Sequence, residues 1–122
     1  MTRILLLLTL AAATLLAQVA GQWRAEFDTQ VGAMKYRYTF QVDGAKLTGK
    51  AAAETPEGKR ESAITEGLVK GDKLQFVETL QFQGQNIRIE YTGVVKGDEI
   101  KFTRQVGSYA TEDFTAKRVT GQ

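Results

Sequence analysis

Apolar and polar residues alternate with a period of two along most of the chain after residue 22. Between positions 35 and 42 the residues read Lys-Tyr-Arg-Tyr-Thr-Phe-Gln-Val, and segments 85–95 and 99–106 alternate in the same way. This period is typical of strands with one buried face, and no segment of helical length competes with it. The pattern predicts eight strands, at 22–28, 35–42, 46–53, 60–69, 73–82, 85–95, 99–106 and 111–119.

Four short links between these strands share one form, in which an apolar residue, a glycine-containing link and a second apolar residue follow in order. They run from Val42 to Leu47, Val69 to Leu74, Val95 to Ile100 and Phe82 to Ile87. Glycine at the first central position of the turn suits a type II′ hairpin. The first three links recur every 26 or 27 residues, the length of two strands and two turns, which predicts an up-and-down meander.

These hairpins also set the register of the strands. They place a phenylalanine opposite a glycine in three strand pairs: Phe40 with Gly49, Phe76 with Gly67, and Phe102 with Gly93. Large residues beside small ones fill the interior of a narrow closed barrel. We therefore expect an all-β, single-domain, eight-stranded antiparallel up-and-down β-barrel over 22–122. Its mouth is expected at the links 28–34, 54–59, 83–86 and 107–110, three of which are longer than the tight hairpins.

The first 21 residues resemble a signal peptide. Arg3 precedes an apolar run from Ile4 to Leu16, and small residues follow at Ala17, Ala20 and Gly21. The run is shorter than the ~20 residues of a membrane span. The chain is therefore expected to be secreted or periplasmic after cleavage near Gly21.

Composition excludes several classes of function. The chain has no histidine and no cysteine, so His or Cys metal sites, disulfides and His- or Cys-based nucleophiles are excluded, and no cofactor is predicted. The formal net charge of +2 provides no field for nucleic acid. The outward positions are mostly Lys, Arg, Glu, Gln and Thr, which excludes a lipid-facing barrel wall.

A few residues depart from the alternation. Leu68, Val77 and Val94 are apolar but point outward; they are either scattered surface residues or a weak self-association face. Ile64 also points outward in this register, which alternatively indicates a bulge in its strand.

Polar residues interrupt the inward stripe at one level of the barrel. The register places Thr65, Glu78, Tyr91 and Arg104 side by side across four strands. A buried charge needs a partner, so the row is either a structural ion pair bridged by Tyr91 or the polar floor of a ligand site. Small inward residues (Ala51, Ala53, Ala63 and Ala116) favour a cavity. The candidate ligand-binding residues are Glu78, Tyr91, Arg104, Thr65, Tyr38, Tyr36 and Phe76.

The sequence Gly21-Gln22-Trp23 opens the first strand, and Arg118 lies near the end of the last. This resembles the calycin group (lipocalins and avidins), in which Gly-x-Trp begins the barrel and a basic residue of the last strand packs on the Trp. The resemblance implies that Trp23 and Arg118 plug the closed end of a ligand-binding barrel. With a single Trp, a biotin site like that of avidin is not predicted.

The expected function is a secreted barrel that binds a small, partly apolar ligand. Two alternatives stay open. One is an interaction or accessory module whose barrel is filled by side chains. The other is a carboxylate-dependent hydrolase that uses Glu78 with Glu112, since paired carboxylates can serve as acid and base.

Overall fold

The computed structural model describes residues 19–120, so most of the predicted signal peptide, at 1–18, lies outside the described residues. The described part is built from nine strands: β1 (Gly21–Thr29), β2 (Gly32–Asp43), β3 (Lys46–Thr55), β4 (Gly58–Ala63), β5 (Thr65–Lys70), β6 (Lys73–Phe82), β7 (Gln85–Lys96), β8 (Glu99–Val106) and β9 (Ala110–Arg118).

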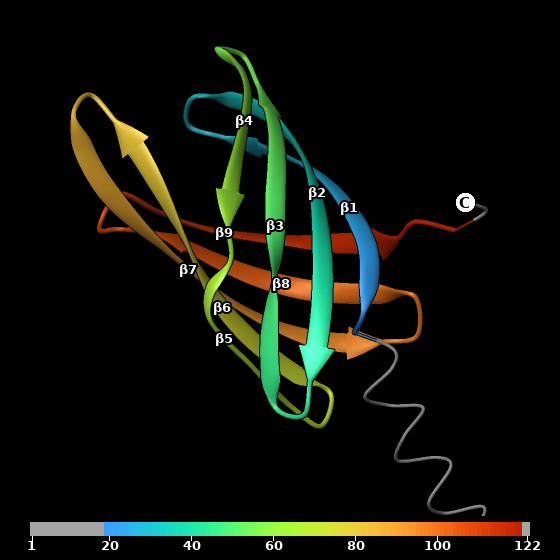
Figure 1. The fold of residues 1–122 in the computed structure, drawn as a ribbon. Helices are drawn as coiled ribbons and strands as arrows, with labels where there is room; N and C mark the ends of the chain where they lie inside the picture. Colours follow the sequence, from blue (N-terminus) through green and yellow to red (C-terminus); the bar gives the residue numbers. More distant parts are fainter. Residues whose placement is uncertain (1–18, 121–122) are drawn as a thin grey trace, which may run out of the picture.

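The strands form one closed antiparallel barrel (Figure 1). Neighbours follow in the order β2-β1-β9-β8-β7-β6-β5-β3, and the pairing of β2 with β3 closes the ring. β4 and β5 are two halves of a single predicted strand, and both pair with β3. The predicted fold, an eight-stranded up-and-down barrel, is therefore confirmed, with one strand divided at Ile64.

Three tight hairpins have the predicted geometry. Gly44, Gly71 and Gly97 have φ of 62–63°, whereas the residue after each has a negative φ, which defines type II′ turns. The fourth link differs from the prediction. Phe82 pairs with Gln85, and both central residues, Gln83 and Gly84, have positive φ. It is a type I′ turn, because glycine occupies the second central position there.

Glycines face aromatic rings inside the barrel as the register predicts. Phe40 pairs with Gly49, and Gly93 pairs with Phe102. A Cβ on Gly49 would lie 1.8 Å from the carbonyl oxygen of Thr39, and one on Gly93 would lie 2.8 Å from the ring of Phe102. These positions therefore allow neighbouring strands and rings to pack closely around the axis.

A bulge at the start of β5 reverses the facing of half a strand. Leu68 pairs with Gln75 and Thr65 with Val77, so Glu66 and Gly67 both lie opposite the single residue Phe76. Glu66 has the positive φ (52°) of this irregularity. An extra residue in one strand shifts the odd-even facing beyond it. Before the bulge in the sequence, the inward set is therefore Arg60, Ser62 and Ile64.

This shift corrects three predictions from the sequence. Thr65 and Ala63 were expected inside but are exposed, and Ile64 was placed outside but is buried; the alternative of a bulge near Ile64 is confirmed. Val77, opposite Thr65, is only 6% exposed. Because bulges increase local twist, this neighbourhood is not a regular sheet face, and Val77 cannot form an exposed face with Leu68 and Val94.

The mouth of the barrel is formed by strand ends rather than by long loops. Only residues 30–31, 56–57, 83–84 and 107–109 link the strands there. Of the three links expected to be longer than the tight hairpins, only 107–109 is, and by one residue. Thr29 explains one short link: its hydroxyl donates to the carbonyl of Gly32 and accepts from the amide of Val31. Within residues 19–120 there is no helix long and apolar enough to cross a membrane.

Candidate functional site

Aromatic rings fill the half of the barrel nearest the tight hairpins. Tyr38 packs 5.2 Å from Tyr36 and 5.9 Å from Phe40 between ring centroids, and Phe76 stacks on Tyr91 at 4.3 Å. All five side chains are 0–2% exposed. In a ligand-binding barrel, Tyr36, Tyr38, Phe40 and Phe76 were expected to form the walls of a cavity and Tyr91 part of its floor, but these rings pack against each other instead.

The closed end carries the pair that the calycin resemblance implied. Trp23 and Arg118 are paired residues of β1 and β9, and the Arg118 guanidinium lies 4.3 Å from the centre of the indole ring, a cation–π geometry. The indole Nε1–H donates to the carbonyl of Val19 at 3.0 Å. Val19 is 1% exposed, so a residue within the predicted signal peptide packs against this end.

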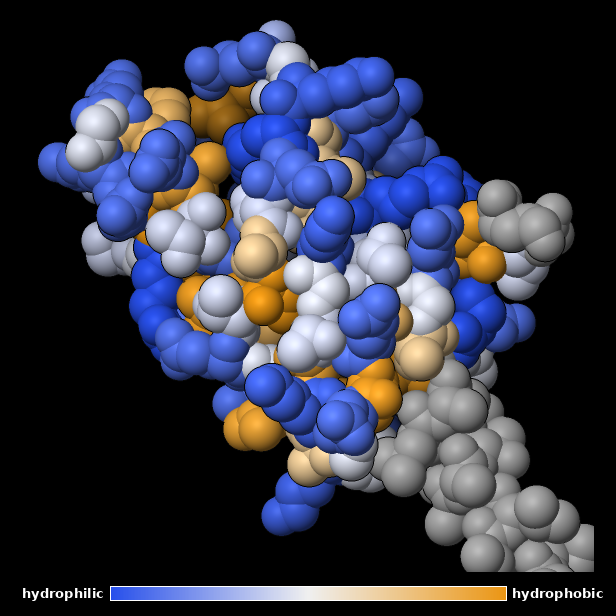
Figure 2. All heavy atoms as spheres, in the orientation of Figure 1, coloured by the Kyte–Doolittle hydropathy of each residue, from blue (hydrophilic) through white to orange (hydrophobic). Residues whose placement is uncertain are grey.

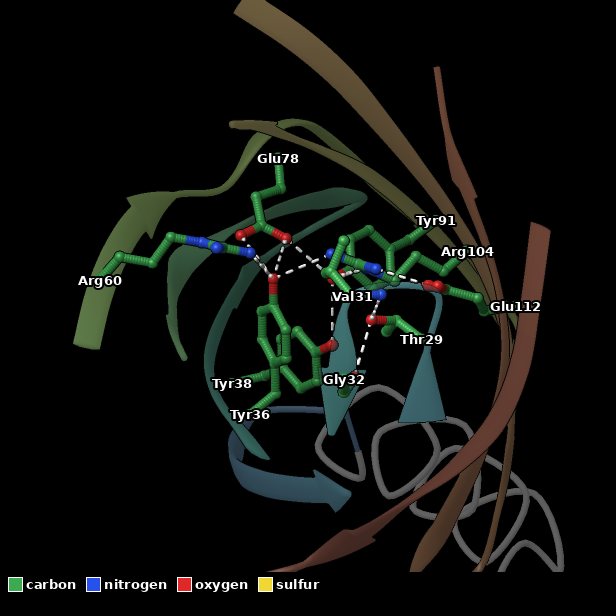
Figure 3. Close-up of polar contacts among 10 residues, drawn as sticks. All are labelled: Thr29, Val31, Gly32, Tyr36, Tyr38, Arg60, Glu78, Tyr91, Arg104 and Glu112. Atoms are coloured by element: carbon green, nitrogen blue, oxygen red, sulfur yellow. Dashed lines mark hydrogen bonds and ion pairs between the residues drawn. The ribbon is translucent and has the colours of Figure 1, made fainter. Parts of the chain in front are cut away.

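Above the aromatic layer lies a network of hydrogen bonds centred on two phenols (Figure 3). The Tyr36 hydroxyl donates to the Glu78 carboxylate (3.1–3.2 Å) and accepts from Arg104 Nη2 at 3.0 Å. The Tyr91 hydroxyl likewise donates to Glu78 Oε1 (2.8 Å) and accepts from Arg104 Nε (2.9 Å) and Tyr38 (3.1 Å). Two phenols therefore bridge a buried carboxylate and a buried guanidinium that form no direct ion pair.

The charges of this network are held in place by burial and by neighbouring groups. Burial raises the pKa of Tyr38 and Tyr91 well above the ordinary value, and burial with the nearby Glu78 carboxylate raises the pKa of Tyr36. Burial by itself would lower the pKa of Arg104, but the facing Tyr91, Tyr36 and Glu78 outweigh it, and the pKa is raised. The phenols therefore stay protonated, as donors, and Arg104 stays charged.

Arg60 joins the network from the opposite side and was missed at the level of sequence. Its Nη2 donates to the Tyr36 hydroxyl at 2.9 Å, and Figure 3 shows Arg60 and Arg104 approaching that hydroxyl from opposite sides. Regular alternation would have pointed Arg60 into solvent, and only the bulge turns it inward. The outward placement of Ile64 was the one signal in the sequence that could have revealed it.

A cup opens above this network toward the mouth. Its volume is about 350 Å³, and Arg60, Arg104 and Glu112 are the charged residues that line it. The uncharged polar residues of the lining are Thr29, Gln30, Gln83 and Gln85. The side chain of Glu112, which is paired with Arg104, is only 13% exposed. The rest of the wall is apolar, and Val31, Phe82 and Tyr109 lie at the rim, 40–62% exposed. The apolar residues of the wall are Met34, Leu80, Ile87, Val106 and Ala110.

Most of the candidate site residues therefore lie beneath the cup rather than in it. Of the seven residues predicted from sequence, Arg104 alone lines the cup. Glu78, Tyr91, Tyr36, Tyr38 and Phe76 are buried below it, and Thr65 is on the outside. Glu78 is 0% exposed and absent from the cup wall, so the geometry does not favour the alternative of hydrolysis by Glu78 with Glu112.

Figure 2 shows a face covered largely by hydrophilic and intermediate residues, with hydrophobic residues at the upper left and in smaller patches near the centre and the lower edge. Leu68 and Val94 are exposed apolar residues elsewhere on the surface, at 52% and 43%. Among the residues that the structure describes, no group of three or more acidic side chains is placed to hold a metal ion.

Fold and site together define a closed eight-stranded antiparallel β-barrel with a packed lower half and an apolar cup at its open end. Comparison with family models, with curated proteins and with solved structures found no match.

Proposed function

We propose that this protein binds a small, partly apolar molecule in the cup at the open end of its barrel. The observation that carries the proposal is the cup itself, which has a volume of about 350 Å³ and a mostly apolar wall. Two arginines and a carboxylate close it below. Small-molecule sites generally have this form, with a mostly apolar lining and a few converging polar groups. The packed layer beneath the cup limits the ligand to the upper half of the barrel.

The calycin resemblance supports the same proposal. The Trp23–Arg118 contact plugs the end opposite the cup, as in a barrel that admits its ligand from one side. The predicted signal peptide supports a place of action outside the cytosol, in the extracellular or periplasmic space.

Titration with a neutral apolar dye, N-phenyl-1-naphthylamine, tests the proposal. The expected result is a saturable fluorescence increase with one dye per barrel. Leu80→Trp adds bulk to the cup wall and should weaken dye binding at least tenfold. Leu68→Trp, the same change at an exposed position outside the barrel, is the control and should leave the affinity unchanged. No saturable signal, or equal effects of the two variants, would refute the proposal.

A second function, as an interaction module, is favoured by the exposure of Val31, Phe82 and Tyr109 around the mouth. A neighbouring protein that contacted this apolar rim would cover the cup. Sedimentation of the purified protein distinguishes the two functions. A stable oligomer that dissociates in Tyr109→Ser supports interaction, whereas a monomer that binds dye supports the cup.

A further inference from the structure

Arg60 is the least satisfied group in the cup. In residues 19–120 its Nε is buried without a hydrogen-bond partner. A guanidinium has five N–H donors, and the hydrogen bond that Arg60 makes is the one to the Tyr36 hydroxyl. A buried polar group without a partner is unfavourable, and native structures rarely keep one without a reason.

The two arginines of the cup differ in their counter-charges. Arg104 forms an ion pair with Glu112, and its guanidinium donates hydrogen bonds to the hydroxyls of Tyr36 and Tyr91. It also lies 5.3–5.7 Å from the centroids of three aromatic rings. Arg60 forms no ion pair with a carboxylate of the described residues, and its partner is a neutral phenol. Arg60 therefore carries a positive charge at the floor of the cup, and its Nε–H lacks an acceptor among the described residues.

From this we infer that the ligand of the cup is an amphipathic acid, whose carboxylate binds Arg60 and whose hydrocarbon chain lies along the wall. This rests on the proposed function and names its ligand class. The planar fork of a guanidinium matches the two oxygens of a carboxylate. The chain would then contact Met34, Leu80, Ile87 and Val106 and end near Phe82 at the rim.

The volume of the cup sets the length of the chain. A methylene or carboxylate group fills about as much space as a water molecule in the liquid, roughly 30 Å³. The cup of about 350 Å³ therefore has room for at most about twelve such groups, and an acid of about ten carbons fits within it. A cationic amphiphile is disfavoured because the floor carries two guanidinium groups and one carboxylate, that of Glu112, which is already paired with Arg104. A neutral alcohol can accept hydrogen bonds from fewer donors than a carboxylate can.

Displacement of N-phenyl-1-naphthylamine by decanoate, 1-decanol and decyltrimethylammonium tests this inference, with decanoate kept below its micelle concentration. The affinity of decanoate, measured from displacement of the dye, should be at least tenfold higher than that of decanol. The ammonium compound should have the lowest affinity of the three. In Arg60→Gln the affinities for decanoate and decanol should come within threefold of each other. Arg37→Gln, at an exposed arginine, is the matched control and should keep the tenfold preference.

The outcomes separate this inference from the proposed function. If decanol binds as tightly as decanoate, or if Arg60→Gln keeps the preference for decanoate, the inference that the ligand is an acid bound by Arg60 is wrong. The cup would still be a binding site for the dye. If the dye itself does not bind, the proposed function fails. Should Arg60→Gln unfold, Arg60→Lys keeps the charge without the fork, and it should retain part of the preference; a complete loss in this variant would contradict the role of the charge.

Discussion

Replacement of Glu78 by glutamine is the most direct test of the network beneath the cup. Glu78 is fully buried and accepts hydrogen bonds from two phenols, and the Tyr36 hydroxyl is shared between both carboxylate oxygens. Glutamine keeps the shape, but it removes the negative charge that faces Arg104 and puts an amide NH₂ where an oxygen accepted. Removing one partner of a buried ionic network costs about 3–5 kcal/mol.

The lower end of that range applies here, because Arg104 keeps its ion pair with Glu112. For a domain of this size, 1 kcal/mol corresponds to about 4–8 °C in Tm, so a loss of about 3 kcal/mol predicts a decrease of about 12–24 °C. Thermal unfolding followed by circular dichroism measures it. Glu90→Gln on the neighbouring strand is the control; its ion pair with Arg88 is exposed, and Tm should hardly change, because surface pairs contribute little.

The same variant separates stability from binding. Because Glu78 does not line the cup, Glu78→Gln should leave the dye affinity at 25 °C within about threefold of the original. The reasoning would be refuted by a variant that keeps its Tm but binds dye tenfold more weakly. In that case the carboxylate would contact ligand and the network would not be structural.

Three further predictions follow from the buried contacts. The raised pKa values of Tyr36, Tyr38 and Tyr91 mean that above about pH 10 the unfolded chain loses phenolic protons that the folded chain keeps. Stability should then fall by up to about 1.4 kcal/mol per pH unit for each tyrosine, measured by urea unfolding from pH 9 to 11.5; an unchanged slope in Tyr91→Phe would contradict this. A chain that begins at residue 22 lacks the Val19 carbonyl that accepts from the indole and should be about 1–3 kcal/mol less stable in urea than one that begins at residue 18; equal stability would show that the contact is dispensable. Gly49→Ala should prevent folding or lower Tm by more than 20 °C (a rough figure), since its Cβ would overlap a carbonyl oxygen, whereas Gly84→Ala, also at positive φ but with open space, should give a soluble protein with a smaller loss.

The pairing of most strands could be predicted because each tight hairpin determines which residues of its two strands are paired. Once Gly44, Gly71 and Gly97 are placed in type II′ turns, the residues on either side can face only one way, and the alternation continues to the next turn. The inward positions of Glu78, Tyr91 and Arg104 follow from this reasoning alone. Trp23 and Arg118 meet for the same reason, since closure of a meander brings the last strand beside the first.

The cup could not be predicted in the same way. Alternation cannot count an extra residue, so the bulge at Glu66 and Gly67 concealed the inward position of Arg60. Side-chain volume was also misjudged. Ala51 and Ala53 are small and buried as expected, but the large rings of Tyr36, Tyr38 and Phe40 on the paired strand β2 occupy the space that the alanines leave. The cup therefore lies one layer nearer the mouth than the site predicted from the sequence.

Because of the bulge, the chemistry of the cup depends on the number of residues in this strand as well as on their types. Glu66 adds one residue to the strand, and this decides which of its two alternating sets of side chains points into the barrel. Deleting it would turn Lys59, Glu61 and Ala63 toward the axis and Arg60, Ser62 and Ile64 toward water. The loss or gain of a single codon at this point would therefore change which side chains of this one strand line the barrel, while every other residue stays the same. The chemistry of the cup would change in one genetic step.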